Sequence, residues 1–156
     1  MKLTHIDRKG RPRMVDVSRK TETKRIARAR GEIMLSRKVL ALIAANAVPK
    51  GDVLNAARLA GIQAAKRASD WIPLCHPLRL THIDVVVVPV PGEGLVRVTA
   101  TVKAVDRTGV EMEALTAAAA ACLTVYDMCK AADKRMVIGN IRLVSKVGGK
   151  SGPFQW

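Results

Sequence analysis

LTHIDVVVVPVPGEGLVRVTATVKAVD, residues 80–106, carries the clearest structural pattern in this chain of 156 residues. Its first half is rich in β-branched side chains, and its second half alternates apolar and polar positions, as half-buried strands do. The Pro-Gly-Glu-Gly sequence at 91–94 separates the two halves and is typical of a turn. The pattern therefore predicts two strands, 80–90 and 95–105, that pair as a hairpin.

Two further strands are predicted on either side of this hairpin. Residues 24–35 alternate small or apolar side chains with charged ones, which indicates a strand with one solvated face. Residues 136–147 are rich in Val, Ile and Leu and predict the last strand of the sheet.

Three helices are predicted in the remaining segments. Ser36 is placed to cap a first helix, and residues 52–67 have apolar side chains at helical spacing. The longest helix is predicted over 109–134, where Thr108 and Glu111 have the spacing of a capping box.

The order β-α-α-β-β-α-β predicts an α+β fold. In this class the helices pack on one face of an antiparallel sheet, here in a ferredoxin-like arrangement. The chain contains no internal repeat or low-complexity linker. We therefore expect a single domain over 1–156, with a polar N-terminal segment at 1–22 and a Gly-rich C-terminal tail at 147–156.

The composition excludes several classes of protein. Hydrophobic residues make up 49% of the chain, which is enough for a packed core and argues against disorder. The longest uncharged run, 114–126, is shorter than the roughly 20 residues that span a bilayer. The chain start has no apolar stretch like that of a secretory signal, and three cysteines without CxxC spacing predict neither disulfides nor a zinc site. We expect a reduced, soluble, cytoplasmic protein.

The formal net charge of +14 indicates a polyanionic partner, such as nucleic acid, a membrane surface or a phosphorylated small molecule. The four scattered aromatic residues make a poor platform for stacking bases, and no helix has the pattern of a basic recognition helix. Specific binding of nucleic acid is therefore not predicted, whereas non-specific binding through charge stays open.

One face of the longest predicted helix is a candidate site. Glu113, Ala120 and Asp127 lie seven residues apart and share this face, and Lys130 reaches the same side. The other residues on this face are small: Ala117, Thr124 and Ala131. Such a face indicates close approach by a ligand or by a partner's backbone. On spacing alone, the favoured alternative is a surface helix with ordinary ion pairs.

A second candidate is the loop 72–77, Ile-Pro-Leu-Cys-His-Pro. Pro73 and Pro77 exclude a continuous helix there and stiffen a segment that presents Cys75 and His76. A histidine in this position has the chemistry of an acid, a base or a phosphate partner, although a structural, hydrogen-bonded histidine is the commoner case. Cys75 is expected to contribute its backbone or its bulk, because no acid that would orient a thiolate pair is indicated.

Four segments closely resemble the cyclic pyranopterin monophosphate synthase family of molybdenum cofactor biosynthesis. They are MVDVS (14–18), KGDVLNAARLAGIQAAKRASDWIPLCHPL (50–78), TGVEMEALTAAAAACLTVYDMCKA (108–131) and KVGGKSG (146–152). The likeness runs from about Leu3 to Gly152, and its IPLCHP, GVEMEAL and YDMCKA motifs are highly specific.

The resemblance implies a lyase that converts 3′,8-cyclo-7,8-dihydroguanosine 5′-triphosphate into cyclic pyranopterin monophosphate and pyrophosphate. It implies no required cofactor, although release of pyrophosphate makes a bound Mg²⁺ chemically reasonable. It also implies a homohexamer, a trimer of dimers, with the active site at a subunit interface. The alternatives from other classes are a basic nucleic-acid or nucleotide-binding module without chemistry and a family member kept only as a scaffold.

The resemblance assigns roles to particular residues. Asp127 matches the family's active-site aspartate, and Lys50 and Lys130 match lysines proposed as general acid/base groups. The positions implied for substrate binding are Leu74, Cys75, His76, Glu111, Met112 and Glu113, with Arg25, Lys66 and Lys146 near the triphosphate. A lysine that acts as a base needs a lowered pKa, which clustered lysines are expected to provide by mutual repulsion.

Overall fold

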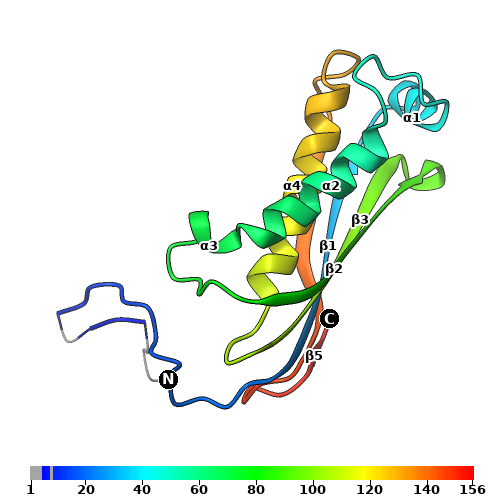
Figure 1. Cartoon of the computed structure of the whole chain (residues 1–156). Helices are drawn as coiled ribbons and strands as arrows, with labels where there is room; N and C mark the ends of the chain where they lie inside the picture. The colour runs from blue at the N-terminus through cyan, green and yellow to red at the C-terminus, as the bar shows by residue number, and fades with distance from the viewer. Residues whose placement is uncertain (1–4, 8) are drawn as a thin grey trace.

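The computed structural model describes residues 5–7 and 9–156, which form a five-stranded antiparallel sheet with helices (Figure 1). The elements are β1 (Thr23–Met34), α1 (Arg37–Ala44), α2 (Val53–Lys66), α3 (Ala68–Trp71), β2 (Leu80–Val90), β3 (Leu95–Asp106), α4 (Glu111–Cys129), β4 (Val137–Val147) and β5 (Phe154–Gln155). The strand order is β2-β3-β1-β4-β5, so β1 is central and pairs with both β3 and β4. The predicted α+β class is confirmed, and the ferredoxin-like arrangement stays a prediction.

The predicted hairpin is confirmed in both extent and pairing. Val90 pairs with Leu95 next to the turn, and the ladder continues to Leu80 and Ala104. The connection Pro91–Glu93 forms a short 3-10 turn that ends at Gly94, whose φ of 69° is the left-handed conformation that glycine adopts without strain.

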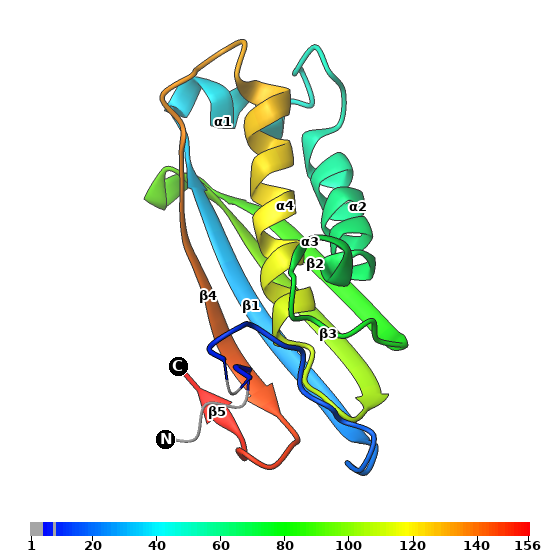
Figure 2. The ribbon, with the colours of Figure 1, turned by 90° about the vertical axis from the view of Figure 1, so that its left-hand side faces the viewer.

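Helices α2 and α4 lie side by side on one face of the sheet (Figures 1 and 2). Alternate side chains of β3 point toward them and are buried: Val96, Val98, Ala100, Val102 and Ala104. Burying each of these valines contributes roughly 1.5–3 kcal/mol relative to exposure. The two helices come close at Gly61, which has no side chain. A Cβ there would lie only 2.9 Å from the carbonyl oxygen of Ala117. Small residues therefore allow the helices to pack tightly against each other and the sheet.

The predicted helix starts are confirmed for the first two helices and wrong for the third. Ser36 caps α1 and Asp52 caps α2, each accepting a hydrogen bond from a main-chain amide. Helix α4 begins at Glu111 with no side-chain cap, so the capping box with Thr108 does not form. The Glu111 carboxylate is instead paired with Lys146. The helix also ends at Cys129 instead of 134, where the chain turns.

Two short elements were not predicted. The segment after α2 holds a single helical turn, α3, before it becomes irregular up to β2. Strand β5 lies in the tail predicted as a Gly-rich extension, and it pairs with β4 at Ser145 and Lys146. Within the predicted polar segment 1–22, residues 1–4 and 8 lie outside the described residues.

Helix α4 has the length and mean hydropathy of a membrane-spanning helix. Half of its most apolar window is buried inside the domain, against α2 and the sheet. Such burial is typical of the core helix of a soluble protein, because the apolar surface is already covered.

Candidate active site

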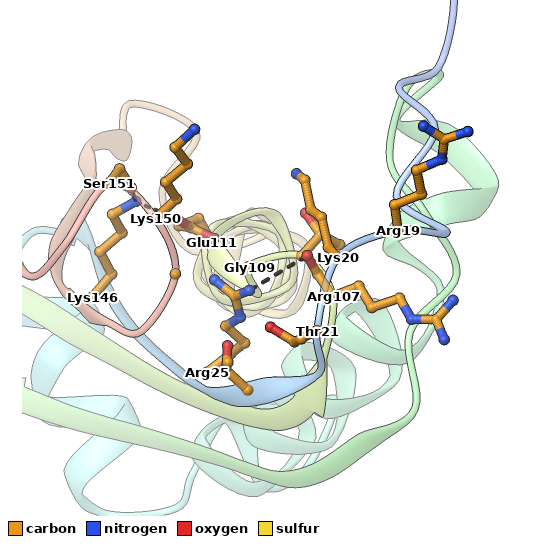
Figure 3. A pocket seen from close by; sticks show the side chains of 13 residues that line it. Arg19, Lys20, Thr21, Arg25, Arg107, Gly109, Glu111, Lys146, Lys150 and Ser151 are labelled. Carbon is orange, nitrogen blue, oxygen red and sulfur yellow. Dashed lines mark hydrogen bonds and ion pairs between the residues drawn. The ribbon is translucent and has the colours of Figure 1, made fainter.

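A basic cavity of about 750 Å³ lies beside the first turn of α4, where β1 begins and β4 ends (Figure 3). Its lining includes one acid, Glu111, and six bases: Arg19, Lys20, Arg25, Arg107, Lys146 and Lys150. In Figure 3, Arg25 lies at the centre, with Lys146 and Lys150 on one side and Arg107 on the other. This excess of positive charge around one cavity suits a polyanionic ligand.

Arg25 is fixed at the centre of this cavity by the sheet. It lies on the helix-facing side of β1 and is only 9% exposed. Its Nε donates to the carbonyl oxygen of Asp106 at 3.3 Å, and its Nη2 donates to that of Arg107 at 3.4 Å. Since neither acceptor is a carboxylate, the guanidinium keeps its full charge available to an anion in the cavity.

Gly149 lets the C-terminal loop approach this guanidinium closely. Its φ is 89°, and a Cβ at this position would overlap the Nη1 atom of Arg25. The glycine is required both for its conformation and for the space that Arg25 occupies.

Gly149→Ala is expected to weaken binding of inorganic tripolyphosphate roughly tenfold to a hundredfold, because the displaced guanidinium loses charged hydrogen bonds. Isothermal titration calorimetry measures this. Gly152→Ala is the matched control, since Gly152 also has a positive φ, 73°, but nothing lies within 4 Å of its added Cβ. Equal losses in both variants would mean that backbone strain, and not Arg25, accounts for the effect.

Lys146 connects β4 to the first turn of α4. Its Nζ lies 3.2 Å from Glu111 Oε1 and donates to Ser151 Oγ at 2.6 Å. A carboxylate in the first turn of a helix is favoured by the helix dipole, so Glu111 is a stable partner. The structure thus brings together three predicted site residues, Arg25, Glu111 and Lys146.

Glu113 and Cys75 form a buried pair on the other side of the first turn of α4. Cys75 Sγ donates to Glu113 Oε1 at 3.4 Å, while Glu113 Oε2 is buried without a hydrogen-bond partner. Burial raises the pKa of the Glu113 carboxyl. Burial and the neighbouring Glu113 charge raise the pKa of the Cys75 thiol to about 12. This thiol stays protonated at neutral pH, in line with the expectation that Cys75 supplies no thiolate.

The predicted small-residue face of α4 is therefore not a single open surface. Glu113 is 3% exposed and Ala117 is fully buried, because both face α2 and the loop after it. Ala117 is approached closely by Gly61 of the same chain, which accounts for its small side chain. Only the C-terminal part of this face, from Ala120 to Asp127, reaches the surface.

Glu113→Gln is expected to remove a pH dependence of stability. A carboxyl whose folded pKa is raised stabilises the protein fully below its unfolded value of 4.5 and loses that contribution as pH rises through the folded value. As the pH rises above 4.5, the Tm of the natural protein should therefore fall relative to the Tm of Glu113→Gln. Calorimetric melting between pH 4 and 8 checks this, and a constant difference would contradict it.

The remaining predicted binding residues surround these groups. Leu74 and His76 are half-buried in the loop with Cys75, and Met112 is exposed at the start of α4. The Nε2 atom of His76 lies 2.9 Å from the carbonyl oxygen of Val15. Lys66, expected near Arg25 and Lys146, does not line the basic cavity and borders a small hollow beside Glu113.

Asp127, Lys50 and Lys130 meet at the C-terminal end of α4. Asp127 Oδ2 lies 2.7 Å from Lys50 Nζ, and Asp127 Oδ1 lies 2.7 Å from Lys130 Nζ. Lys50 also donates to the main-chain oxygen of Asp127. Hydrogen bonds from Lys130 and Lys50 lower the pKa of Asp127 to about 2. The structure thus brings together the three residues to which the resemblance assigned catalytic roles, called here the Asp127 triad.

The expected lowering of lysine pKa values by mutual repulsion is wrong for Lys130. The Asp127 carboxylate stands between the two ammonium groups and raises the pKa of Lys130. Attraction to the carboxylate outweighs the repulsion between the lysines because the carboxylate is the nearer charge. Lys130 therefore carries its proton at neutral pH.

The two groups of residues lie at opposite ends of α4 (Figure 2). Glu111 begins the helix and Asp127 lies in its last turn, so about 24 Å of helix separates them at a rise of 1.5 Å per residue. One small molecule does not contact both ends within a single chain.

Sequence reasoning missed Arg19, Lys20 and Arg107 as cavity residues. Arg19 and Lys20 lie in a charged segment without periodicity, and Arg107 follows the end of β3. The excess of bases was the available signal, but it did not say which bases converge. Among residues 5–7 and 9–156, no three His, Cys, Asp or Glu side chains lie close enough to hold a metal ion.

Comparison with known proteins gives one consistent result. The MoaC family model matches residues 14–149. Proteins named cyclic pyranopterin monophosphate synthase match nearly the whole chain. The one from Roseiflexus sp. (strain RS-1) is 58% identical over 97% of this chain and 96% of its own length. Those from Pelotomaculum thermopropionicum and Clostridium perfringens (strain SM101) are each 54% identical, over 98% and 99% of this chain and 90% and 98% of their own lengths.

Proposed function

This chain belongs to the MoaC family, and from that premise we propose that it is a cyclic pyranopterin monophosphate synthase. It is a lyase that converts 3′,8-cyclo-7,8-dihydroguanosine 5′-triphosphate into cyclic pyranopterin monophosphate and pyrophosphate in molybdenum cofactor biosynthesis. The observation that carries the proposal is the basic cavity at the start of α4, whose size and charge suit a nucleoside triphosphate.

The basic cavity holds the triphosphate. Six bases against one acid offset the roughly four negative charges of the substrate's phosphates. When the cyclic phosphate closes, negative charge builds up on the departing pyrophosphate. Arg25 and Lys146, already fixed by main-chain and carboxylate contacts, stabilise this charge without having to reorganise.

The Asp127 triad carries out the proton transfers. Ring opening, pyrazine formation and phosphate closure each require protons to be moved to and from the substrate. Asp127 orients both ammonium groups, and Lys130, which is protonated at neutral pH, donates to a leaving nitrogen or oxygen. Lys50 completes the triad as the second proton carrier.

The loop pair at the start of α4 recognises the ring system. Glu113 presents a buried oxygen without a protein partner, which is suited to ring N–H groups of the substrate. Cys75 holds the other oxygen of the carboxyl, and Lys66 borders the small hollow beside Glu113. Leu74 and Met112 are the sequence neighbours of Cys75 and Glu113 and complete this binding region.

A complete site requires a second subunit. The triad lies about 24 Å along α4 from the basic cavity, which is too far for one substrate. A twofold axis across the middle of α4 would bring the triad of one subunit to the cavity of another and create two equal sites per dimer. This geometry supports the dimer with active sites at its subunit interface, and the proposed homohexamer, a trimer of such dimers, rests on the family resemblance.

The protein is proposed to act in the cytoplasm, without a membrane, a specific nucleic-acid partner or a required cofactor. A Mg²⁺ ion that arrives with the substrate's phosphates fits the chemistry of pyrophosphate release. No step above depends on it.

Incubation of the purified protein with the cyclic dihydroguanosine triphosphate tests the proposal. We expect pyrophosphate and the pterin product, detected after oxidation, in equal amounts. Tight binding without either product would contradict the enzymatic activity. Neither binding nor turnover, together with a salt-sensitive gel shift with RNA, would favour the basic nucleic-acid-binding alternative.

A further inference from the structure

His76 makes an unusual contact for a residue of a substrate-binding loop. Its Nε2 lies 2.9 Å from the main-chain carbonyl oxygen of Val15, in the segment that precedes β1. A carbonyl oxygen only accepts hydrogen bonds, so the ring nitrogen must carry the proton and donate it. The Nε2 atom is therefore already occupied by the protein's own backbone.

The segment that His76 holds leads directly into the basic cavity. After Val15 the chain turns, with Ser18 N donating to Asp16 Oδ1 at 2.8 Å and Lys20 N donating to Val17 O at 3.0 Å. Arg19, Lys20 and Thr21 then line the cavity before β1 begins.

Few other polar contacts fix this segment to the domain, although Val15 and Val17 are half-buried. Within the described residues, no other hydrogen bond joins residues 14–19 to the body of the domain. Beyond them, Glu22 pairs with Arg79 at 3.3 Å and Arg107 at 3.9 Å, both at the surface. Exposed pairs of this kind contribute little to order.

We propose that His76 is a positioning residue, which donates to Val15 and thereby holds the N-terminal segment so that Lys20 and Arg19 complete the anion-binding cavity. This inference rests on the proposed function only for the identity of the anion, a triphosphate. The loop is suited to the role, because Pro73 and Pro77 flank it and Cys75 N donates to Ile72 O at 3.0 Å.

Two substitutions separate this role from acid–base catalysis and from packing. His76→Gln keeps an N–H donor near the position of Nε2 but has no titrating group. His76→Phe keeps a flat ring but has no donor. We expect His76→Phe to bind inorganic tripolyphosphate about three- to tenfold more weakly, which corresponds to the loss of one hydrogen bond, and His76→Gln to bind nearly as well as the natural protein.

Three further readouts accompany the calorimetry. Trypsin should cleave at Arg19 and Lys20 faster in His76→Phe than in His76→Gln. With the cyclic nucleotide, His76→Phe should raise KM much more than it lowers kcat. Lys20→Ala should cost less affinity in the His76→Phe background than in the natural protein, because the segment is already released there.

The inference is overturned if both variants lose kcat with unchanged tripolyphosphate affinity and trypsin cleavage, since His76 would then act on the substrate itself. It is also overturned if neither variant differs from the natural protein. Tripolyphosphate binding and proteolysis require no turnover. If the natural protein fails to convert the cyclic nucleotide, the proposed function fails, while these two readouts still decide the role of His76.

Discussion

Lys50→Ala and Lys130→Ala are each expected to lower turnover of the cyclic nucleotide by about a hundredfold or more, the range of a lost general acid or base. Each lysine lies 2.7 Å from an oxygen of Asp127, so either substitution breaks the triad and leaves the carboxylate with a single partner. Pyrophosphate release and pterin fluorescence after oxidation measure the loss. Tripolyphosphate affinity should fall far less than turnover, because neither lysine lines the basic cavity of its own chain.

Lys38→Ala is the control for the loss of one positive charge. Lys38 is exposed on α1 and takes no part in the triad or the cavity. Its substitution is expected to leave turnover, tripolyphosphate affinity and assembly size unchanged. Near-normal product formation in both Lys50→Ala and Lys130→Ala would remove the triad from the mechanism.

Mixing two inactive variants from opposite ends of α4 should restore activity. Lys130→Ala damages the triad and Lys146→Ala damages the cavity, so each variant alone lacks every complete site. In a mixed dimer, the intact cavity of one subunit meets the intact triad of the other. Each mixed dimer has one of its two sites intact, so an unselected random mixture should show about a quarter of the natural turnover and purified mixed dimers about half.

Co-expression with two affinity tags and sequential purification isolates the mixed assemblies for this measurement. The matched control combines Lys50→Ala with Lys130→Ala, which damage the same triad and should restore nothing. A mixed Lys130→Ala and Lys146→Ala assembly without recovery would contradict a site shared between subunits. Recovery in the control pair as well would point to contamination with the natural protein, because neither variant supplies an intact triad.

The main elements of the fold follow from local patterns in the sequence. The period-two alternation of β1 and β3, the Pro-Gly turn between β2 and β3, and the caps at Ser36 and Asp52 involve residues close in sequence. Such elements can therefore be predicted from short stretches of sequence. The predicted capping box was wrong because Glu111 pairs with Lys146, a residue far away in the sequence that local patterns do not identify.

Most residues of the candidate site could also be predicted from the sequence through its motifs. The sequence did not predict that they form two separate groups, the basic cavity and the Asp127 triad. A motif identifies which residues act, and it contains no information on how far apart they lie. Only the length and packing of α4 separate the triad from the cavity.

What the sequence determined by itself was the main strands and helices, the large excess of positive charge and the identity of the family. What only the tertiary structure decided was which side chains meet: Lys50 with Asp127, Arg25 with the carbonyl of Asp106, and His76 with Val15. These pairs are separated by dozens of residues, and their contacts depend on strand order, register and the packing of α4 against the sheet. Periodicity arises from the geometry of one element, whereas a site is built where several elements converge.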